Sequence, residues 1–252
     1  MRKSVSEISD IYKQADIHML PAFIKEYESD ERSGVQSLVN KAKKRLLELE
    51  KEKERMYEMF SYERKYGEYT YICGVDEVGC GPLAGPVVSA AVILPKDCDI
   101  LYLNDSKKLT ENKREELFDE IMEKAVSVGI GFATPERIDE INIRQADFEA
   151  MRMAISELSV EPDFIMVDGY PIGGIEKKQI SIVKGDAKSA SIAAASIIAK
   201  VTRDRLMTQY DEVFPGYGFA SNKGYGSAEH IEAIKKLGAT PIHRKTFIKN
   251  FV

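Results

Sequence analysis

Residues 69–94, YTYICGVDEVGCGPLAGPVVSAAVIL, contain the pattern that decides the fold class. Residues 69–75 and 87–94 are short runs rich in apolar and β-branched side chains, which predict two strands. The segment between them, EVGCGPLAGP, is dense in glycine and proline and is typical of turns. Asp76 and Glu77 directly follow the first run, so two acids are expected where the first strand ends.

Downstream of this stretch, short apolar runs alternate with longer amphipathic segments. The predicted strands cover residues 126–133, 164–167 and 180–183, and the predicted helices cover residues 111–124, 138–158, 189–207 and 227–237, the last ended by Gly238. Strands that alternate with helices indicate an α/β domain, in which helices cover a sheet with at least some parallel strands.

The first 66 residues have a different, helical pattern. Apolar side chains recur at alternating steps of three and four, which predicts a stripe along one long helix with Ser33 as its N-cap. The stripe consists of Val35, Val39, Ala42, Leu46, Leu49, Met56 and Phe60, with Lys53 interrupting it. A shorter helix is expected before it, ending near Pro21. The composition changes at Gly67, so we expect a helical extension over residues 1–66 and an α/β domain over residues 67–252.

The sequence argues against export and against membrane insertion. No apolar run approaches the ~18 residues of a membrane-spanning helix, and the N-terminal MRKSVSEISDIYK lacks the continuous apolar segment of a secretory signal. Cys73, Cys80 and Cys98 form no CxxC pair, which argues against a disulfide framework and a structural zinc site. We therefore expect a reduced cytoplasmic protein, and we expect it to act as a monomer.

The net charge of −5 conceals an uneven distribution along the chain. Residues 67–176 carry 9 basic and 22 acidic side chains, whereas residues 177–252 carry 13 basic and 6 acidic ones. Such runs are either solvated surface or an acidic metal centre beside a basic track for nucleic acid. Overall acidity does not exclude nucleic-acid binding, because binding depends on the local patch.

Four acids lie at the ends of apolar runs or in adjacent loops. Besides Asp76 and Glu77, Asp168 follows the run FIMV, and Asp186 lies in KGDAKS before a helix. Function in α/β sheets concentrates at strand ends, so these carboxylates are expected to share one space and to need cations. Oxygen ligands suit Mg²⁺ or Mn²⁺, and two such ions could hold the attacking and leaving oxygens of a phosphodiester. Alternatively, Asp168 is a turn residue and Asp186 a helix cap.

Asp76 and Glu77 are neighbours, and successive side chains of a strand point to opposite faces. One of them is therefore expected to reach a metal past the strand end or through its backbone carbonyl. Taken alone, these residues indicate a metal-dependent phosphoryl-transfer or nucleic-acid enzyme.

Five ordered motifs resemble the ribonuclease HII family, the type 2 class of ribonucleases H. They are GVDEVGCGPLAGPV at 74–87, DSKKL at 105–109, VDG at 167–169, KGDAKSASIAAASIIAKVTRDR at 184–205, and NKGYG at 222–226 followed by GATPIHRKTF at 238–247. The resemblance implies a ribonuclease H-like fold with a central mixed sheet flanked by helices. It implies a metal-dependent endonuclease that cuts the RNA strand of RNA–DNA hybrids and ribonucleotides embedded in duplex DNA, leaving a 5′-phosphate and a 3′-hydroxyl.

The resemblance also assigns roles to residues. It implies four catalytic, metal-binding carboxylates, Asp76, Glu77, Asp168 and Asp186, which would hold Mn²⁺ or Mg²⁺. It implies substrate contacts from Gly79, Cys80, Gly81, Lys107, Lys108, Lys184, Lys188 and Tyr225, the tyrosine resembling one that packs on a deoxyribose beside the ribonucleotide. Lys200 and Arg203 are expected in the same basic track. His230 and His243 are expected to hold helices and loops together and not to bind metal.

One position departs from the family pattern. The family's glycine–arginine–glycine element appears here as Gly79–Cys80–Gly81. The glycines let backbone amides approach a ribose and its phosphate closely. The missing arginine would have contacted a phosphate or a nearby acid, so the departure bears on affinity and junction discrimination but leaves the carboxylates intact.

Two other functions remain open from the sequence. One is another two-metal nuclease of the same fold, against which the DSKKL and NKGYG motifs argue. The other is an inactive hybrid-binding protein, against which the presence of all four acids argues. For residues 1–66 we expect either a module that helps to bind substrate or a structural buttress.

Overall fold

The structure is a computed structural model that describes residues 3–250. It divides the chain into two compact units, Met1–Tyr57 and Glu58–Val252. Each unit has its own hydrophobic cluster and is described by itself.

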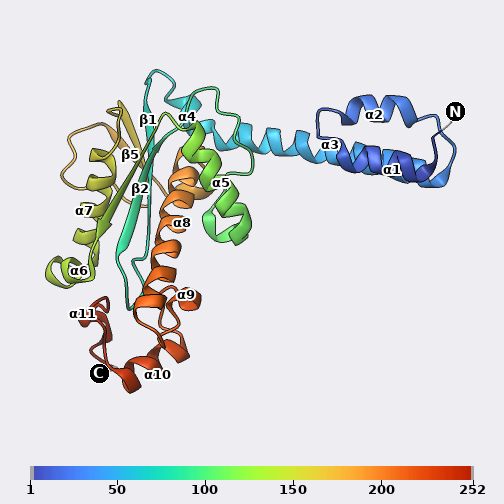
Figure 1. Ribbon diagram of the computed structural model, residues 1–252. Helices are drawn as coiled ribbons and strands as arrows, with labels where there is room; N and C mark the ends of the chain where they lie inside the picture. The colour runs from blue at the N-terminus through green and yellow to red at the C-terminus, as the bar shows by residue number, and fades with distance from the viewer. Residues whose placement is uncertain (1–2, 251–252) are drawn as a thin grey trace. The chain divides into compact units, whose positions relative to one another are not determined.

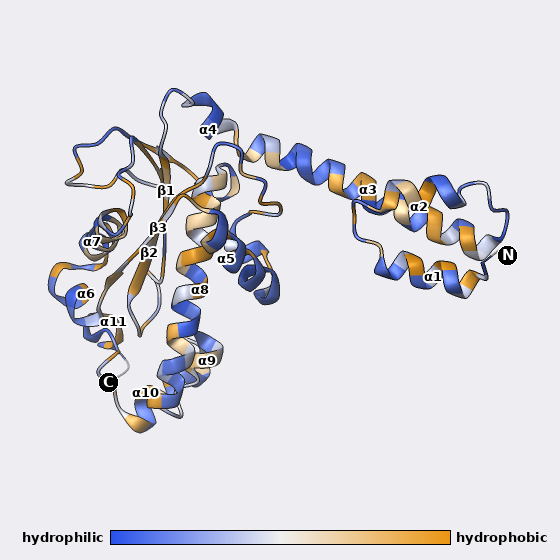
Figure 2. Cartoon of the chain, turned by 45° about the horizontal axis from the view of Figure 1, so that its top comes forward, coloured by the Kyte–Doolittle hydropathy of each residue, from blue (hydrophilic) through white to orange (hydrophobic). Residues whose placement is uncertain are grey.

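The larger unit contains a five-stranded mixed sheet, in the order β3-β2-β1-β4-β5 (Figure 1). Its strands are β1 Ile72–Val78, β2 Val87–Ile93, β3 Ser127–Ala133, β4 Phe164–Asp168 and β5 Gln179–Ile182. β1, β2 and β3 form an antiparallel meander, whereas β4 and β5 are parallel to β1. The strands are largely hydrophobic in Figure 2, as expected for a sheet covered on both faces. The expected α/β fold with a mixed sheet is confirmed.

Long helices cover the two faces of this sheet (Figure 1). Helix α8, Ala190–Val213, packs across β1 and β2, and helix α5, Glu111–Lys124, packs beside α8. Helix α7, Ile143–Ser156, covers β2 and β3. Close contact depends on small residues, because a Cβ added at Gly74 would lie 2.1 Å from the backbone carbon of Ser191. The Ser/Ala-rich start of α8 therefore lets helix and sheet backbones approach directly.

The predicted helix over residues 138–158 is two helices, α6 Pro135–Ile141 and α7. Asn142 separates them with a φ of 69°, and its side chain accepts hydrogen bonds from the backbone amides of Arg144 and Gln145. Asparagine is one of the residues that adopt a positive φ most often, and it also caps a helix, so it ends α6 and begins α7 within one residue. Apolar periodicity continues across the break, which is why the sequence pattern suggested a single helix.

The remaining helices of the larger unit are short, apart from α10. They are α4 Ser61–Lys65, α9 Phe219–Asn222, α10 Ala228–Leu237 and α11 Lys245–Ile248, together with the 3₁₀ turns η1 Ser106–Lys108 and η2 Gly185–Ala187. Gly238 ends α10 with a φ of 82°, as predicted.

The smaller unit consists of α1 Val5–Gln14, α2 Leu20–Tyr27 and all but the last two residues of α3 Ser33–Met59. The stripe residues Val35, Val39 and Ala42 are buried against the two shorter helices, so the first half of the predicted stripe has its packing partner. Two predictions here were wrong. Pro21 lies in the first turn of α2, which begins at Leu20, instead of ending a helix, since proline fits the first helical turn, where no amide donor is needed. Ser33 is the first residue of α3 and not its N-cap.

Residues 58–66 belong structurally to the larger unit, although the composition changes only at Gly67. The ring of Tyr66 stacks on Phe164 of β4 with a centroid distance of 4.5 Å. Glu63 Oε1 accepts hydrogen bonds from Ser189 Oγ at 2.7 Å and from the Ser191 amide at 2.9 Å. The segment 58–66 thus anchors the start of α8, and a truncation after Tyr66 would remove part of the α/β core.

Candidate active site

Three of the predicted carboxylates meet at one edge of the sheet. Asp76 of β1, Asp168 at the end of β4 and Asp186 of η2 each offer a carboxylate oxygen, and these oxygens lie within 4.8 Å of one another. The parallel pairing of Val75 with Val167 places Asp76 and Asp168 at the same level of adjacent strands. Asp186 follows β5, the next parallel strand, so the edge collects one acid from each of three consecutive parallel elements.

The loop that carries Asp186 is positioned by backbone contacts. Asp168 Oδ1 accepts a 2.6 Å hydrogen bond from the amide of Gly185, which ties the two acidic segments together. A Cβ at Gly185 would lie 2.7 Å from Cδ1 of Ile192 in α8, so a larger residue there would displace that side chain. The N-cap of α8 is Ser189, whose hydroxyl accepts from the Ile192 amide. Asp186 is therefore free of the helix-capping role that the sequence left open for it.

Burial makes these carboxylates dependent on positive charge. Asp76 is 5% exposed, and burial, followed by the charges of Glu77 and Asp168, raises its pKa well above the usual range. Burial, followed by the charges of Asp105 and Asp168, also raises the pKa of Asp186. A divalent cation would relieve this repulsion and restore the ionised forms. The oxygen-only donor set fits Mg²⁺ or Mn²⁺.

Lys107 is the predicted substrate lysine that faces this centre. Partial burial opposes its charge, but Asp76, Asp105 and Asp186 outweigh that effect and raise its pKa. Asp105 caps η1 by accepting from the Lys107 amide at 2.9 Å, and its charge contributes to the raised pKa of Asp186, so the DSKKL loop lies beside Asp186. Asp105 was not among the predicted site residues, although its place in that motif could have suggested it.

The other predicted lysines are more exposed. Lys108 lies 3.8 Å from Asp105. Lys184 and Lys188 flank Asp186 on the surface, and Lys188 Nζ donates to the Val183 carbonyl at 2.8 Å.

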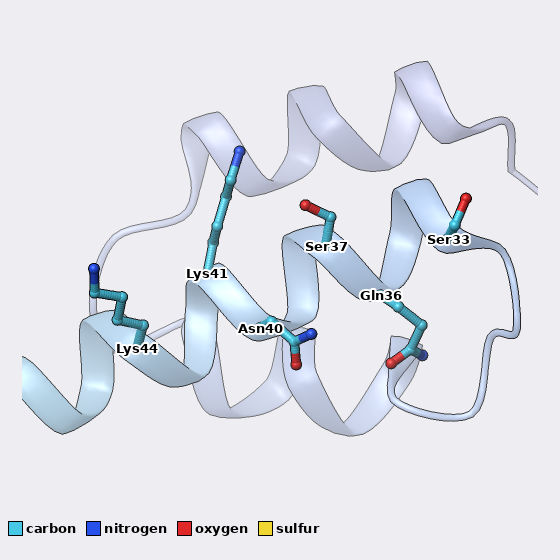
Figure 3. A pocket seen from close by; sticks show the side chains of 6 residues that line it. All are labelled: Ser33, Gln36, Ser37, Asn40, Lys41 and Lys44. Carbon is cyan, nitrogen blue, oxygen red and sulfur yellow. The ribbon is translucent and has the colours of Figure 1, made fainter.

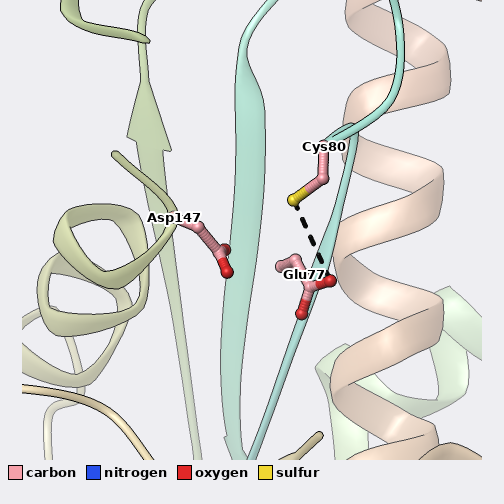
Figure 4. A group of neighbouring side chains, drawn as sticks. All are labelled: Glu77, Cys80 and Asp147. Atoms are coloured by element: carbon pink, nitrogen blue, oxygen red, sulfur yellow. Dashed lines mark hydrogen bonds between the residues drawn. The ribbon is translucent and has the colours of Figure 1, made fainter. Parts of the chain in front are cut away.

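The side chain of Glu77 points away from the three aspartates, because successive side chains of a strand point to opposite faces of the sheet. Its carboxylate lies with Cys80 and Asp147 of α7 (Figure 4), and Cys80 Sγ is 4.0 Å from Glu77 Oε1. Burial, followed by the charge of Asp168, raises the pKa of Glu77, so it remains electrically coupled to the aspartates. Burial and then the charge of Glu77 raise the pKa of Asp147 to about 8. Asp147 lies in no motif, and nothing in the sequence pattern pointed to it.

Two buried arginines hold the Gly79–Cys80–Gly81 loop and its neighbours. Arg244 donates to the carbonyls of Gly79 at 2.6 Å, Cys80 at 3.0 Å and Gly85 at 2.8 Å. Arg203 donates to the carbonyls of Pro86, Ala84 and Lys223. Both are 0% exposed, so the expected place of Arg203 in a basic surface track was wrong. Lys200 pairs with Asp204 at 2.8 Å.

The side chain of Cys80, which replaces the family's arginine, faces Glu77. An arginine at position 80 would therefore meet an acid.

Tyr225 stands on the exposed side of the same loop. It is 45% exposed, and its Cε1 lies 3.8 Å from where a Cβ on Gly81 would be. Its carbonyl contacts Nδ1 of His230 at 2.8 Å, and His230 Nε2 lies 3.0 Å from His243 Nε2. The two histidines therefore connect the NKGYG segment to the last part of the chain, as predicted.

Comparisons with known proteins identify the same family for both units of the chain. A family model described as Ribonuclease HII matches residues 73–250, and one described as Ribonuclease HII N-terminal domain matches residues 4–67. A ribonuclease HII of Lachnoclostridium phytofermentans is 59% identical over 247 residues, covering 97% of each chain. A ribonuclease HII of Clostridioides difficile is 51% identical over 252 residues, covering 99% of each.

Solved structures share the fold of the larger unit. The ribonuclease H2 of Pyrococcus horikoshii is 30% identical with a TM-score of 0.62, over 72% of this chain and 96% of its own. The ribonuclease HII in a PCNA complex from Archaeoglobus fulgidus is 29% identical with a TM-score of 0.58, over 69% of this chain and 93% of its own. Within residues 3–250, no helix combines the length and apolar character needed to cross a membrane.

Proposed function

The chain belongs to the ribonuclease HII family of hydrolases, endonucleases of the RNA strand of RNA–DNA hybrids, and on that premise we propose that it also cuts at ribonucleotides embedded in duplex DNA by two-metal catalysis. The observation that carries the proposal is the meeting of Asp76, Asp168 and Asp186 at one sheet edge. We further propose that it acts as a cytoplasmic monomer in DNA replication and repair.

The acidic centre would hold the ions and align the scissile phosphate. Asp76, the most buried of the three aspartates, would hold the ions together with Asp168, Asp186 and Glu77. Bound Mg²⁺ or Mn²⁺ would activate a water for attack and stabilise the charge on the leaving 3′-oxygen. Lys107 would hold a non-bridging phosphate oxygen, since its charge is kept by the surrounding acids. The products would carry a 5′-phosphate and a 3′-hydroxyl.

Recognition of a ribonucleotide would rest on the Gly79–Gly81 loop and Tyr225. Glycine at position 81 leaves backbone amides accessible to a 2′-hydroxyl, and an exposed aromatic ring nearby can pack on the following sugar only where that sugar lacks a 2′-hydroxyl. Lys108, Lys184 and Lys188 are exposed around the centre and would contact flanking phosphates.

A duplex DNA with one ribonucleotide tests this function. With Mg²⁺ or Mn²⁺ we expect a single cut at the ribonucleotide, and no cut in the same duplex made entirely of DNA. A four-way DNA junction serves as the second substrate. Cleavage of the junction with no cleavage of the ribonucleotide duplex would instead favour another nuclease of this fold.

A pair of glycine substitutions separates folding from recognition. Gly79→Ala should destabilise the protein by roughly 2–5 kcal/mol, because residue 79 has a φ of 98° and its Cβ would lie 2.4 Å from Arg203 Nε. Gly81→Ala should leave stability nearly unchanged but weaken binding of the ribonucleotide duplex by ~10-fold, about 1.4 kcal/mol. Its methyl group would fill space next to Tyr225. Urea unfolding measures the stability of the two variants, and fluorescence-anisotropy titrations measure their affinity for the ribonucleotide duplex. Equal losses of stability in Gly79→Ala and Gly81→Ala would contradict the separate roles of the two glycines.

For the N-terminal unit, we propose that a groove on α3 binds the phosphate backbone of the substrate. Figure 3 shows the groove, lined by Ser33, Gln36, Ser37, Asn40, Lys41 and Lys44. Its lining is made of hydroxyl, amide and ammonium groups, with no acid. Residues 33–47 hold four basic and no acidic side chains. This excess of positive charge beside hydroxyl and amide groups fits the binding of phosphates.

Replacing Lys41 and Lys44 by alanine tests the groove. Each lost phosphate contact should reduce the slope of log K against log salt by about 0.9, so the double variant should lower it by about 2. Affinity should fall most at low salt. Lys51 and Lys53, exposed on the same helix outside the groove, provide the matched double variant, which should keep the wild-type slope. An unchanged slope for Lys41→Ala/Lys44→Ala would instead favour a buttress role.

A shortened protein that lacks the N-terminal unit addresses the same question. It should begin at Glu58 and not at Glu68, because Glu63 and Tyr66 belong to the α/β core.

A further inference from the structure

A second group of potential metal ligands lies beside the three-aspartate centre, and two of its members, Cys80 and Asp147, have no part in the proposed hydrolysis. Glu77 of β1, Cys80 of the glycine loop and Asp147 of α7 offer one carboxylate, one sulfur and one carboxylate donor. These donor atoms all lie within 4.8 Å of one another, and in Figure 4 the three side chains point into the same space. Three separate segments of the chain therefore converge there.

A buried carboxylate oxygen of Asp147 provides an independent reason to expect a ligand. Its Oδ1 is inaccessible to solvent and has no hydrogen-bond partner in the part of the chain that the structure describes. Buried polar atoms are normally satisfied, and an unpaired buried carboxylate oxygen is costly. Arg244, which donates to the Cys80 carbonyl, is committed to backbone carbonyls, and Cys80 itself packs among apolar residues that include Val87 and Ala146. A cation in this space would supply the missing partner.

From this arrangement we propose that Glu77, Cys80 and Asp147 bind a thiophilic divalent cation of the Zn²⁺ class, at a site separate from the three aspartates. A sulfur donor favours Zn²⁺ or Cd²⁺, whereas Mg²⁺ prefers oxygen ligands alone. Binding replaces the thiol proton, which leaves to solvent, by a metal–sulfur bond, and three protein ligands leave one position for water. The site uses a single cysteine with acids from distant segments, so it has no CxxC signature in the sequence.

Occupation of this site would inhibit the enzyme. Glu77 adjoins Asp76 and is coupled by charge to Asp168, and Cys80 lies between Gly79 and Gly81. An ion that holds both side chains would withdraw Glu77 from the catalytic ions and fix the recognition loop. This consequence rests on the proposed nuclease function, whereas the binding site itself does not.

A binding titration with Cd²⁺ tests the site without any reaction. In excess Mg²⁺, the wild-type protein should take up one equivalent of Cd²⁺ with an ultraviolet thiolate-to-cadmium absorption band. Cys80→Ser should lose the band, and Asp147→Asn should weaken Cd²⁺ binding by at least ~10-fold. Two controls should keep the wild-type band. They are Cys98→Ser, which removes another partly buried thiol, and Asp186→Asn, which alters the aspartate centre.

The inhibitory consequence is measured separately by adding Zn²⁺ to the Mg²⁺-dependent cleavage assay. Zn²⁺ should inhibit the wild-type and Cys98→Ser enzymes equally, while Asp147→Asn should cut in Mg²⁺ and need at least ~10-fold more Zn²⁺ for half inhibition. Circular dichroism melting confirms that each variant is folded. A band that persists in Cys80→Ser, or that Asp147→Asn leaves unchanged, overturns the site. A normal band with no cleavage of any substrate would reject the nuclease function and leave the site standing.

Discussion

Asp76→Asn should reduce cleavage of the ribonucleotide duplex by at least about 10³-fold in kcat at saturating Mg²⁺. Asp76 offers its carboxylate to the same space as Asp168 and Asp186 and is nearly inaccessible to solvent, so it would hold the ions there. Asparagine keeps the shape but removes the charge that holds the ions. Hybrid binding should persist, because the lysines and the glycine loop that contact phosphates and sugars are unchanged.

Stability distinguishes this loss from simple unfolding. Burial, followed by the charges of Glu77 and Asp168, raises the pKa of Asp76, so its ionised form is unfavourable in the metal-free fold. Removing the charge should therefore leave the metal-free melting temperature unchanged or raise it, while Mg²⁺ or Mn²⁺ should stabilise the variant less than the wild type. Asp97→Asn, the same change on an exposed residue, is the matched control and should retain full activity. Near wild-type turnover of Asp76→Asn would show that the catalytic centre lies elsewhere.

Arg244→Ala should destabilise the protein by roughly 3–5 kcal/mol, because buried carbonyls lose a charged donor at about 1–3 kcal/mol each. The carbonyls concerned belong to Gly79, Cys80 and Gly85, and the guanidinium is 0% exposed. Burial and then the charge of Arg203 lower the pKa of Arg244 to about 10, so it remains protonated at neutral pH. The glycine loop should lose its fixed conformation, and affinity for the ribonucleotide duplex should fall as well.

Urea denaturation of Arg244→Ala should show a clear decrease in the midpoint concentration, with cleavage weakened even where the protein is folded. Arg137→Ala is the control, since Arg137 forms exposed ion pairs with Glu140 and Glu149 and its loss should change the midpoint little. If Arg244→Ala unfolded at the wild-type midpoint, the loop would be held by contacts other than this guanidinium.

Much of the fold followed from local patterns along the sequence. The predicted strand at residues 87–94 and the helix at residues 111–124 agree with β2 and α5, because apolar periodicity directly reflects which face of an element is buried. The break at Asn142 was missed because the same apolar periodicity runs through both helices that it separates.

The residues of the candidate site also fall into those that the sequence pattern indicated and those that it did not. Asp76, Asp168 and Asp186 were recognisable because each follows an apolar run or lies in a motif, and parallel strands bring such ends to one edge. Asp147 and Glu63 were not recognisable, since nothing near them in the sequence marks their contacts with Glu77 or with the start of α8.

The sequence by itself determined the α/β class, the mixed arrangement suggested by the family motifs, and the three acids that meet. These depend on short-range periodicity and on residue type. Only the tertiary structure decided that Glu77 turns toward Cys80 and Asp147, and that Arg203 and Arg244 are buried supports and not surface contacts. Arg244 and Gly79 are 165 positions apart, and a hydrogen bond at that separation exists only after the sheet and its helices have packed. Burial, and with it the partner of each charge, is a property of the assembled fold.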